Sequence, residues 1–189
     1  MTETGTITMT EIEVKIKISS LPDLRKKLEE LGAEIIKDRY FEDNTLYDFK
    51  HQELRQKKSA LRLRKINKKC FLTFKGPPLK SRSFKIREEY ETEVKNEKQT
   101  KKILKKIGLK ATFTYSKFRT VFKFQRVKLF IDETPIGNFI EIEGKQSDIV
   151  KVARQLGYSR RDFIKKDYIQ LLLEAQTEKT KEKKTNLSP

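Results

Sequence analysis

The sequence predicts an α+β domain: an antiparallel sheet or barrel of about eight strands with helices attached to it. Most of the chain alternates between apolar and polar residues with a period of two, which is typical of half-buried strands. Three shorter segments instead repeat their apolar residues with helical spacing. Mostly short turns join the predicted strands, which favours antiparallel neighbours.

The predicted strands follow one another with few interruptions. They span 10–18, 34–47, 60–66, 69–76, 84–94, 112–124, 127–133 and 138–144. Each of the three predicted helices ends just before a glycine, a residue that commonly stops a helix. They span 21–31, 97–107 and 147–156. A last ordered stretch, 162–173, ends in a short apolar run.

A single domain is expected over residues 9–173, because no linker rich in Pro, Gly or Ser divides the chain. Residues 1–8 are small and polar, which predicts a flexible N-terminus. Residues 174–189 are polar, rich in Lys and without apolar periodicity, which predicts a disordered tail.

The composition excludes several classes of chemistry. With 44 Lys and Arg against 27 Asp and Glu, the net charge is +17, which attracts polyanions such as nucleotides, nucleic acid or anionic membrane. The single cysteine, Cys70, and the single histidine, His51, exclude a disulfide framework, a Cys-rich zinc site and Ser-His-Asp catalysis. Any metal should be a hard cation held by carboxylates.

The sequence also predicts a soluble, cytoplasmic protein. No apolar stretch approaches the roughly 20 residues that cross a bilayer, so no membrane partner is expected. The N-terminus lacks the basic-then-apolar order of a signal peptide.

Almost every predicted strand carries its charges on one face and its apolar residues on the other, because side chains alternate along a strand. The charged faces hold Glu11, Glu13, Lys15 and Lys17; Arg62 and Arg64; Lys75; Lys85, Arg87, Glu89, Glu91 and Glu93; Lys117, Arg119 and Lys123; Asp132; and Glu141 and Glu143. One interpretation is the solvated face of an open sheet with cross-strand ion pairs. Near-unbroken charge along so many strands favours a face that curls inward around a lumen.

A lumen lined by both signs of charge needs a ligand that reconciles them. A polyphosphate with a divalent metal does so, because Lys and Arg neutralise phosphate oxygens while carboxylates hold the metal. The charge pattern therefore predicts a metal–phosphate site.

Several short motifs occur in a fixed order along the chain. They are Glu11-Ile12-Glu13-Val14-Lys15, Leu61-Arg62-Leu63-Arg64, Leu72-Thr73-Phe74-Lys75-Gly76-Pro77, Lys85-Ile86-Arg87-Glu88-Glu89, Lys117-Phe118-Arg119, and Asp132-Glu133-Thr134-Pro135-Ile136-Gly137-Asn138-Phe139-Ile140-Glu141-Ile142-Glu143-Gly144. The first is an ExExK signature. Together they resemble the CYTH superfamily, the triphosphate tunnel metalloenzymes, over residues 9 to 173, and look closest to bacterial and archaeal proteins grouped with the class IV adenylyl cyclases.

The resemblance implies a closed, eight-stranded antiparallel tunnel that binds a triphosphate with Mg²⁺ or Mn²⁺. The positions that match the family's metal ligands are Glu11, Glu13, Asp132, Glu141 and Glu143. The positions that match its phosphate ligands are Lys15, Arg62, Arg64, Lys75, Lys85, Arg87, Lys117, Arg119 and Lys166.

Two segments depart from the family's pattern. Lys166-Asp167-Tyr168 stands where a Lys-Ser-Tyr triplet is frequent, and places an acid next to the matching lysine. The segment 40–44 (YFEDN) differs from the YFD-type sequence of triphosphatases, which argues against a catalytic tyrosine there.

Other residues have ordinary structural interpretations. At least one of Glu89, Glu91 and Glu93 should neutralise lumen cations. His51 is expected in an exposed loop and Cys70 in the core, and the lysines within 101–106 should form the solvated side of a helix.

The leading interpretation is a metal-dependent enzyme resembling class IV adenylyl cyclase, which converts ATP to cyclic AMP and pyrophosphate. Hydrolysis of tripolyphosphate, thiamine triphosphate or a nucleotide is an alternative in the same tunnel. A non-catalytic module that binds polyanions or nucleic acid is a third, but the aromatic residues lie on the faces opposite the charges, which disfavours nucleic acid. A homodimer is compatible with the sequence.

Overall fold

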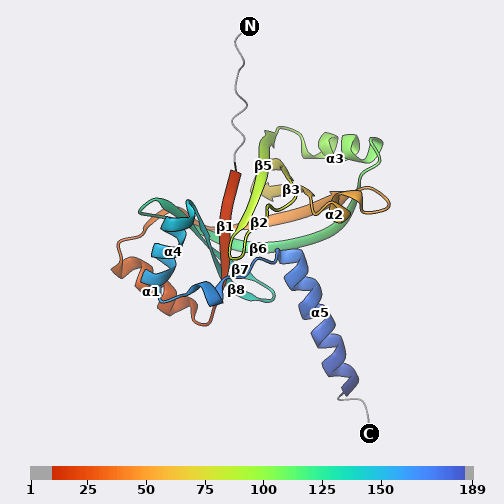
Figure 1. The fold of residues 1–189 in the computed structure, drawn as a ribbon. Coiled ribbons are helices and arrows are strands. Elements are labelled where there is room, and N and C mark those ends of the chain that lie inside the picture. Colours follow the sequence, from red (N-terminus) through yellow and green to blue (C-terminus); the bar gives the residue numbers. More distant parts are fainter. Residues whose placement is uncertain (1–9, 186–189) are drawn as a thin grey trace.

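The computed structural model describes residues 10–185, which form a closed barrel of eight antiparallel strands with helices outside it (Figure 1). This confirms the predicted fold class. The strands are β1 (Thr10–Ile18), β2 (Glu34–Asp48), β3 (Ala60–Ile66), β4 (Lys69–Lys75), β5 (Lys85–Val94), β6 (Lys110–Phe124), β7 (Val127–Thr134) and β8 (Gly137–Glu143).

The strands follow the order β1-β5-β4-β3-β2-β6-β7-β8 around the barrel, and β8 pairs with β1 to close it. Closure leaves no strand edge unpaired, so every strand presents one face to the lumen and one to the outside. The long ribbon of β2 and β6 is irregular: its register shifts near Lys37 and again near Tyr47. Each shift changes which residues face inward.

The helices are α1 (Leu21–Glu30), α2 (Glu53–Gln56), α3 (Glu97–Lys106), α4 (Gln146–Gln155) and α5 (Tyr168–Thr185), with a 3₁₀ turn at Arg160–Asp162. The ranges expected for α1, α3 and α4 agree within one residue at each end. The short α2 and the 3₁₀ turn were not expected, because elements of four and three residues carry no helical period. Of the described helices, none has the length and apolar character that a membrane span requires.

The C-terminal segment differs from the disorder that the sequence predicts from residue 174 onward. Helix α5 continues to Thr185 and runs away from the barrel (Figure 1). Lys, Glu, Gln and Ala dominate this stretch and are good helix formers, so a helix can form without an apolar face. The flexible N-terminus predicted over 1–8 and the tail residues 186–189 lie outside the described residues.

Two apolar clusters fill the space between the barrel's outer surface and the helices. The larger one packs α1 and α4 against β1, β7 and β8, with Leu28, Ile140 and Ile149 fully buried. The smaller one joins Leu104 of α3 to Leu63 and the buried Cys70, as expected for that cysteine. Because apolar burial is satisfied outside the barrel, the inward faces are left for polar residues.

Candidate active site: a charged tunnel

The barrel encloses a cavity of about 410 Å³ lined mainly by charged side chains. Nine basic residues line it: Lys15, Arg62, Arg64, Lys75, Lys85, Arg87, Lys117, Arg119 and Lys128. Seven acidic residues line it as well: Glu11, Glu13, Glu89, Glu91, Glu141, Glu143 and Asp167. Of the fourteen positions predicted for the site, the cavity thus brings together all except Asp132 and Lys166.

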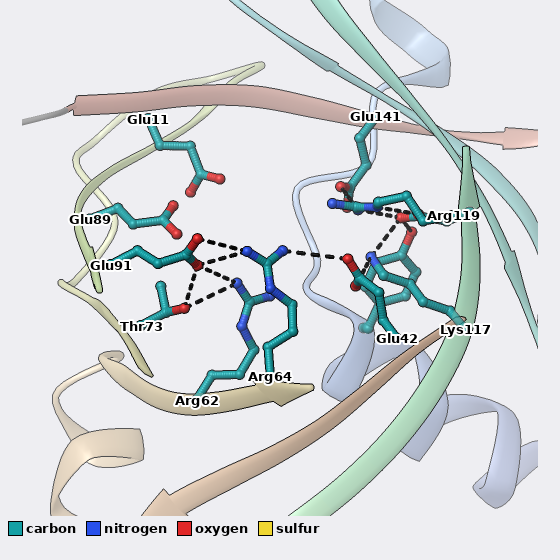
Figure 2. Close-up of polar contacts among 12 residues, drawn as sticks. Glu11, Glu42, Arg62, Arg64, Thr73, Glu89, Glu91, Lys117, Arg119 and Glu141 are labelled. Carbon is teal, nitrogen blue, oxygen red and sulfur yellow. Dashed lines mark hydrogen bonds and ion pairs between the residues drawn. The ribbon is translucent and has the colours of Figure 1, made fainter. Parts of the chain in front are cut away.

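Two arginines of β3 point toward side chains of the neighbouring strands β4 and β5 (Figure 2). The guanidinium of Arg64 donates to both oxygens of Glu91 at 2.8 Å. Arg62 donates to the hydroxyl of Thr73 at 3.4 Å, and that hydroxyl donates to Glu91 at 2.7 Å. Glu91 therefore holds both arginines, in a fork geometry that also suits phosphate oxygens.

Glu42 of β2 is a buried member of the site that the sequence did not predict. It is fully buried, and Arg64 donates to it at 3.4 Å (Figure 2), while the Lys117 ammonium lies 3.8 Å away. Burial alone would raise the pKa of Glu42, but Arg119, Lys117 and Arg64 lower it to about 2. Glu42 is thus an ionised, buried counter-charge for Arg64, Lys117 and Arg119.

Asp132 of β7 binds cationic side chains and does not line the cavity, which departs from the metal-ligand role expected of it. Lys117 donates to it at 2.8 Å, and Arg119 donates through two nitrogens, both at 2.6 Å. The Tyr168 hydroxyl donates to it at 2.6 Å. With its oxygens bound by these donors and no exposed surface, Asp132 positions Lys117 and Arg119.

Tyr168 was named in the sequence only as part of a triplet, and it is a central residue of the site. The chain before α5 runs beside β1, where Ile164 forms an isolated antiparallel β-bridge with Lys15. The ammonium groups of Lys15 and Lys117 lie 4.2 and 4.7 Å from the centre of the Tyr168 ring. Burial, together with the adjacent Asp132, raises the pKa of Tyr168 well above its usual value, so its hydroxyl stays protonated.

Lys166 lies on the outside, which departs from its expected role as a phosphate ligand. Its ammonium lies 2.8 Å from Glu174 of α5, and half of its side chain is exposed. Its neighbour Asp167 lines the cavity instead, 4.0 Å from Arg87. The direction of the chain entering α5 therefore turns Asp167 and Tyr168 inward and Lys166 outward.

The carboxylates of β1 and β8 form an acidic wall, here defined as Glu11, Glu13, Glu141 and Glu143. In the register Glu13 faces Glu143, and Lys15 faces Glu141. Lysines neutralise the wall: Lys75 lies 2.8 Å from Glu11, Lys85 lies 3.0 Å from Glu13, and Lys15 lies 2.7 Å from Glu141.

The acidic wall is electrostatically uneven. Burial and the neighbouring Glu13 raise the pKa of Glu11 to about 7. Burial also favours protonation of Glu13, but Lys85 outweighs it and lowers the pKa of Glu13 to about 2. Burial raises the pKa of Glu143. Crowded carboxylates of this kind favour a bound cation, because a cation relieves their mutual repulsion.

The donors of the acidic wall fit a hard divalent cation, since they are all carboxylate oxygens. Within residues 10–185, no three His, Cys, Asp or Glu side chains stand grouped as a ready-made metal site. Three of the four wall carboxylates are paired with a lysine, so a cation there would compete with those lysines for the carboxylate oxygens.

Three further expectations are settled by the positions of the side chains. Glu89 pairs with Lys75 at 2.9 Å and Glu91 with the arginines, so both neutralise cavity cations as expected, while Glu93 is half exposed beside Lys69. His51 lies in an exposed turn. Sequence analysis missed Lys128, which lines the cavity from β7.

Comparison with known proteins agrees with this architecture. A family model described as the CYTH domain matches residues 9–168. A Methanocaldococcus jannaschii protein named "Putative adenylate cyclase" is 30% identical over 174 residues, which cover 86% of this chain and 98% of the relative.

Two solved structures share the fold. A Pyrococcus horikoshii protein is 27% identical, with a TM-score of 0.73 over 85% of this chain and 98% of its own. A Hippeastrum protein, described as an adenylyl cyclase candidate with a dominant triphosphatase activity, has a TM-score of 0.61 over 78% of this chain and 88% of its own. At 21% identity the second supports the fold alone.

Proposed function

Because the chain belongs to the CYTH domain family, as the match over residues 9–168 shows, we propose that it is a divalent-metal-dependent enzyme acting on a triphosphate in the tunnel. The leading reaction is that of a class IV adenylyl cyclase, which forms cyclic AMP and pyrophosphate from ATP. One observation carries the proposal: inside a closed barrel, nine basic and seven acidic side chains line one cavity.

The basic side chains would bind and neutralise the phosphates. Arg62 and Arg64 offer two-pronged donors, and Lys15, Lys75 and Lys85 line the same cavity as point charges. In cyclisation the ribose 3′-hydroxyl attacks the α-phosphorus, a P–O bond forms, and the bond to the leaving pyrophosphate breaks. Cations that hold the pyrophosphate stabilise the charge that it acquires.

The acidic wall would hold the cation, Mg²⁺ or Mn²⁺. Bound there, such a cation neutralises phosphate oxygens and lowers the pKa of the attacking hydroxyl. Glu11, Glu13, Glu141 and Glu143 are the residues we assign to it. Positioning by the chain itself supplies the rest, since no covalent nucleophile is required.

Hydrolysis is the second candidate reaction. Water would attack the terminal phosphorus of tripolyphosphate, thiamine triphosphate or a nucleotide held by the same residues. Hydrolysis needs the same phosphate-binding cations and the same acidic wall as cyclisation, and the cavity supplies both. The basic side chains of the cavity point inward, so an extended nucleic acid is not the partner that we propose.

The test is to incubate the protein with ATP, tripolyphosphate or thiamine triphosphate, each with Mg²⁺ or Mn²⁺, and to identify every product. Cyclic AMP with equimolar pyrophosphate supports the cyclase, whereas inorganic phosphate supports the hydrolase. Tight binding without any product from all three compounds would refute an enzyme and leave a polyanion-binding module.

A further inference from the structure

Part of the cavity lining is uncharged. Four residues from four different elements form this part, here called the uncharged wall: Leu46 of β2, Ala60 of β3, Tyr115 of β6 and Ile169 of α5. Apart from Thr10, Phe130 and Tyr168, the rest of the lining is Lys, Arg, Glu and Asp. A site that served phosphate alone would gain nothing from apolar side chains in this position.

The uncharged wall adjoins the arginines that we assign to phosphate. Leu46 faces Arg62 in the strand register, and Ala60 lies two residues before Arg62 on the same face of β3. Tyr115 also lies close enough to Arg62 to affect its pKa. A group joined to a phosphate that Arg62 binds would therefore lie against this wall.

Within the uncharged wall, Tyr115 supplies an aromatic ring that is accessible from the cavity. The ring of Tyr168 lies 6.0 Å from it, but Tyr168 is only 6% exposed and is flanked by Lys15 and Lys117. Tyr115 is less buried than Tyr168 and lines the cavity. Aromatic rings bind flat uncharged groups by stacking and by apolar contact.

We propose that the uncharged wall binds the organic group of a triphosphate ester, a flat group such as a nucleobase, and that Tyr115 is a specificity-determining residue. This inference rests on the proposed function, because the phosphates must first lie on Arg62 and its neighbours. It excludes inorganic tripolyphosphate as the preferred ligand, since that ion has no group for the wall to bury.

The experiment measures binding of ATP and of tripolyphosphate by calorimetry in Ca²⁺, with the compounds checked for integrity after each titration. The variants are Tyr115→Leu, which removes the ring, and Tyr115→Phe, which keeps it. Tyr90→Leu is the matched control, because Tyr90 is a 44% exposed tyrosine of β5 that does not line the cavity. Ile169→Ser tests the wall from α5, outside the barrel strands.

We expect wild type to bind ATP at least tenfold more tightly than tripolyphosphate. Tyr115→Leu should weaken ATP binding by about 5- to 150-fold, the range found for removing a stacking ring, and should change tripolyphosphate binding by less than about twofold. Unchanged tripolyphosphate binding also shows that the variant is folded. Ile169→Ser should weaken ATP binding alone, and Tyr115→Phe and Tyr90→Leu should match wild type.

Two results overturn the inference while leaving the proposed function intact. One is tripolyphosphate binding as tight as that of ATP in wild type, and the other is an equal loss of both ligands in Tyr115→Leu. Failure of wild type to bind either compound would instead overturn the proposed function, and the inference with it.

Discussion

Replacing Glu42 by glutamine should weaken the fold substantially, because this carboxylate is fully buried among cations. Folding lowers the pKa of Glu42 from 4.5 to about 2, since Arg119, Lys117 and Arg64 outweigh its burial. Each pKa unit corresponds to about 1.4 kcal/mol, so the ionised carboxylate stabilises the fold by about 3 kcal/mol at neutral pH. Glutamine keeps the shape of the side chain but removes the charge.

The sign of the pH dependence follows from the lowered pKa. The stabilisation is fully present above the unfolded-state pKa of 4.5 and disappears as the pH falls toward about 2. Wild type and Glu42→Gln should therefore differ by about 3 kcal/mol in the free energy of unfolding at pH 7, and by about half of that near pH 3. Urea unfolding at each pH measures the difference.

A polyanion should reverse part of this loss. In Glu42→Gln, Arg64 and Lys117 each lose one of their two counter-charges and keep only Glu91 and Asp132, so tripolyphosphate should bind more tightly to the variant than to wild type. The added stabilisation approaches about 2.7 kcal/mol for a ligand at 100 times its dissociation constant. Unfolding with and without tripolyphosphate tests this directly.

The control variant is Glu93→Gln on β5, where the carboxylate is half exposed and lies 3.4 Å from Lys69. An exposed pair of this kind contributes at most about 1 kcal/mol. The reasoning is refuted if Glu42→Gln costs no more than this control at pH 7, or if its cost is the same at pH 3 as at pH 7.

Three further predictions concern the site and the tail. Arg64→Ala should weaken triphosphate binding and turnover together by about 1.5–3 kcal/mol, or roughly 10- to 150-fold. Replacing both Lys101 and Lys105 on α3 should change binding and turnover little. Equal losses from the two changes would mean that long-range charge draws the ligand. Exhaustive chelation should abolish turnover, which Mg²⁺ or Mn²⁺ should restore, and full activity in chelator would contradict a metal site. Truncation after Glu174 should leave the melting temperature and turnover unchanged, because the part of α5 that it removes extends away from the barrel (Figure 1). A large drop in either quantity would show that the removed segment acts on the tunnel.

The barrel and most of its lining were predictable because charge and alternation agree. Over residues 61–64 of β3 and 140–143 of β8 the charged and apolar residues alternate, so the sequence alone assigns Arg62 and Arg64 to one face of their strand, and Glu141 and Glu143 to one face of theirs. A closed barrel then brings these faces together, whatever the order of its strands.

Glu42 was missed because β2 does not alternate in this way. Glu42 and Asp43 are adjacent acids, and Phe41 is 45% exposed although it is aromatic. The register shifts between β2 and β6 also change which side chains face inward along the ribbon. The signal that could have found Glu42 is the row it shares with Asn44 and Leu46, all three buried.

Asp132 shows what a motif alone leaves undecided. Its position in the alternating pattern of β7 shows that its side chain points inward. Whether an inward carboxylate binds a metal or a cationic side chain depends on which donors surround it. Here Lys117, Arg119 and Tyr168 all donate to Asp132, and Tyr168 is 36 residues away along the chain. Carboxylates therefore have two different roles in this barrel. Asp132 and Glu42 are buried and orient the cationic side chains, whereas the acids of β1 and β8 line the cavity and remain within reach of a ligand.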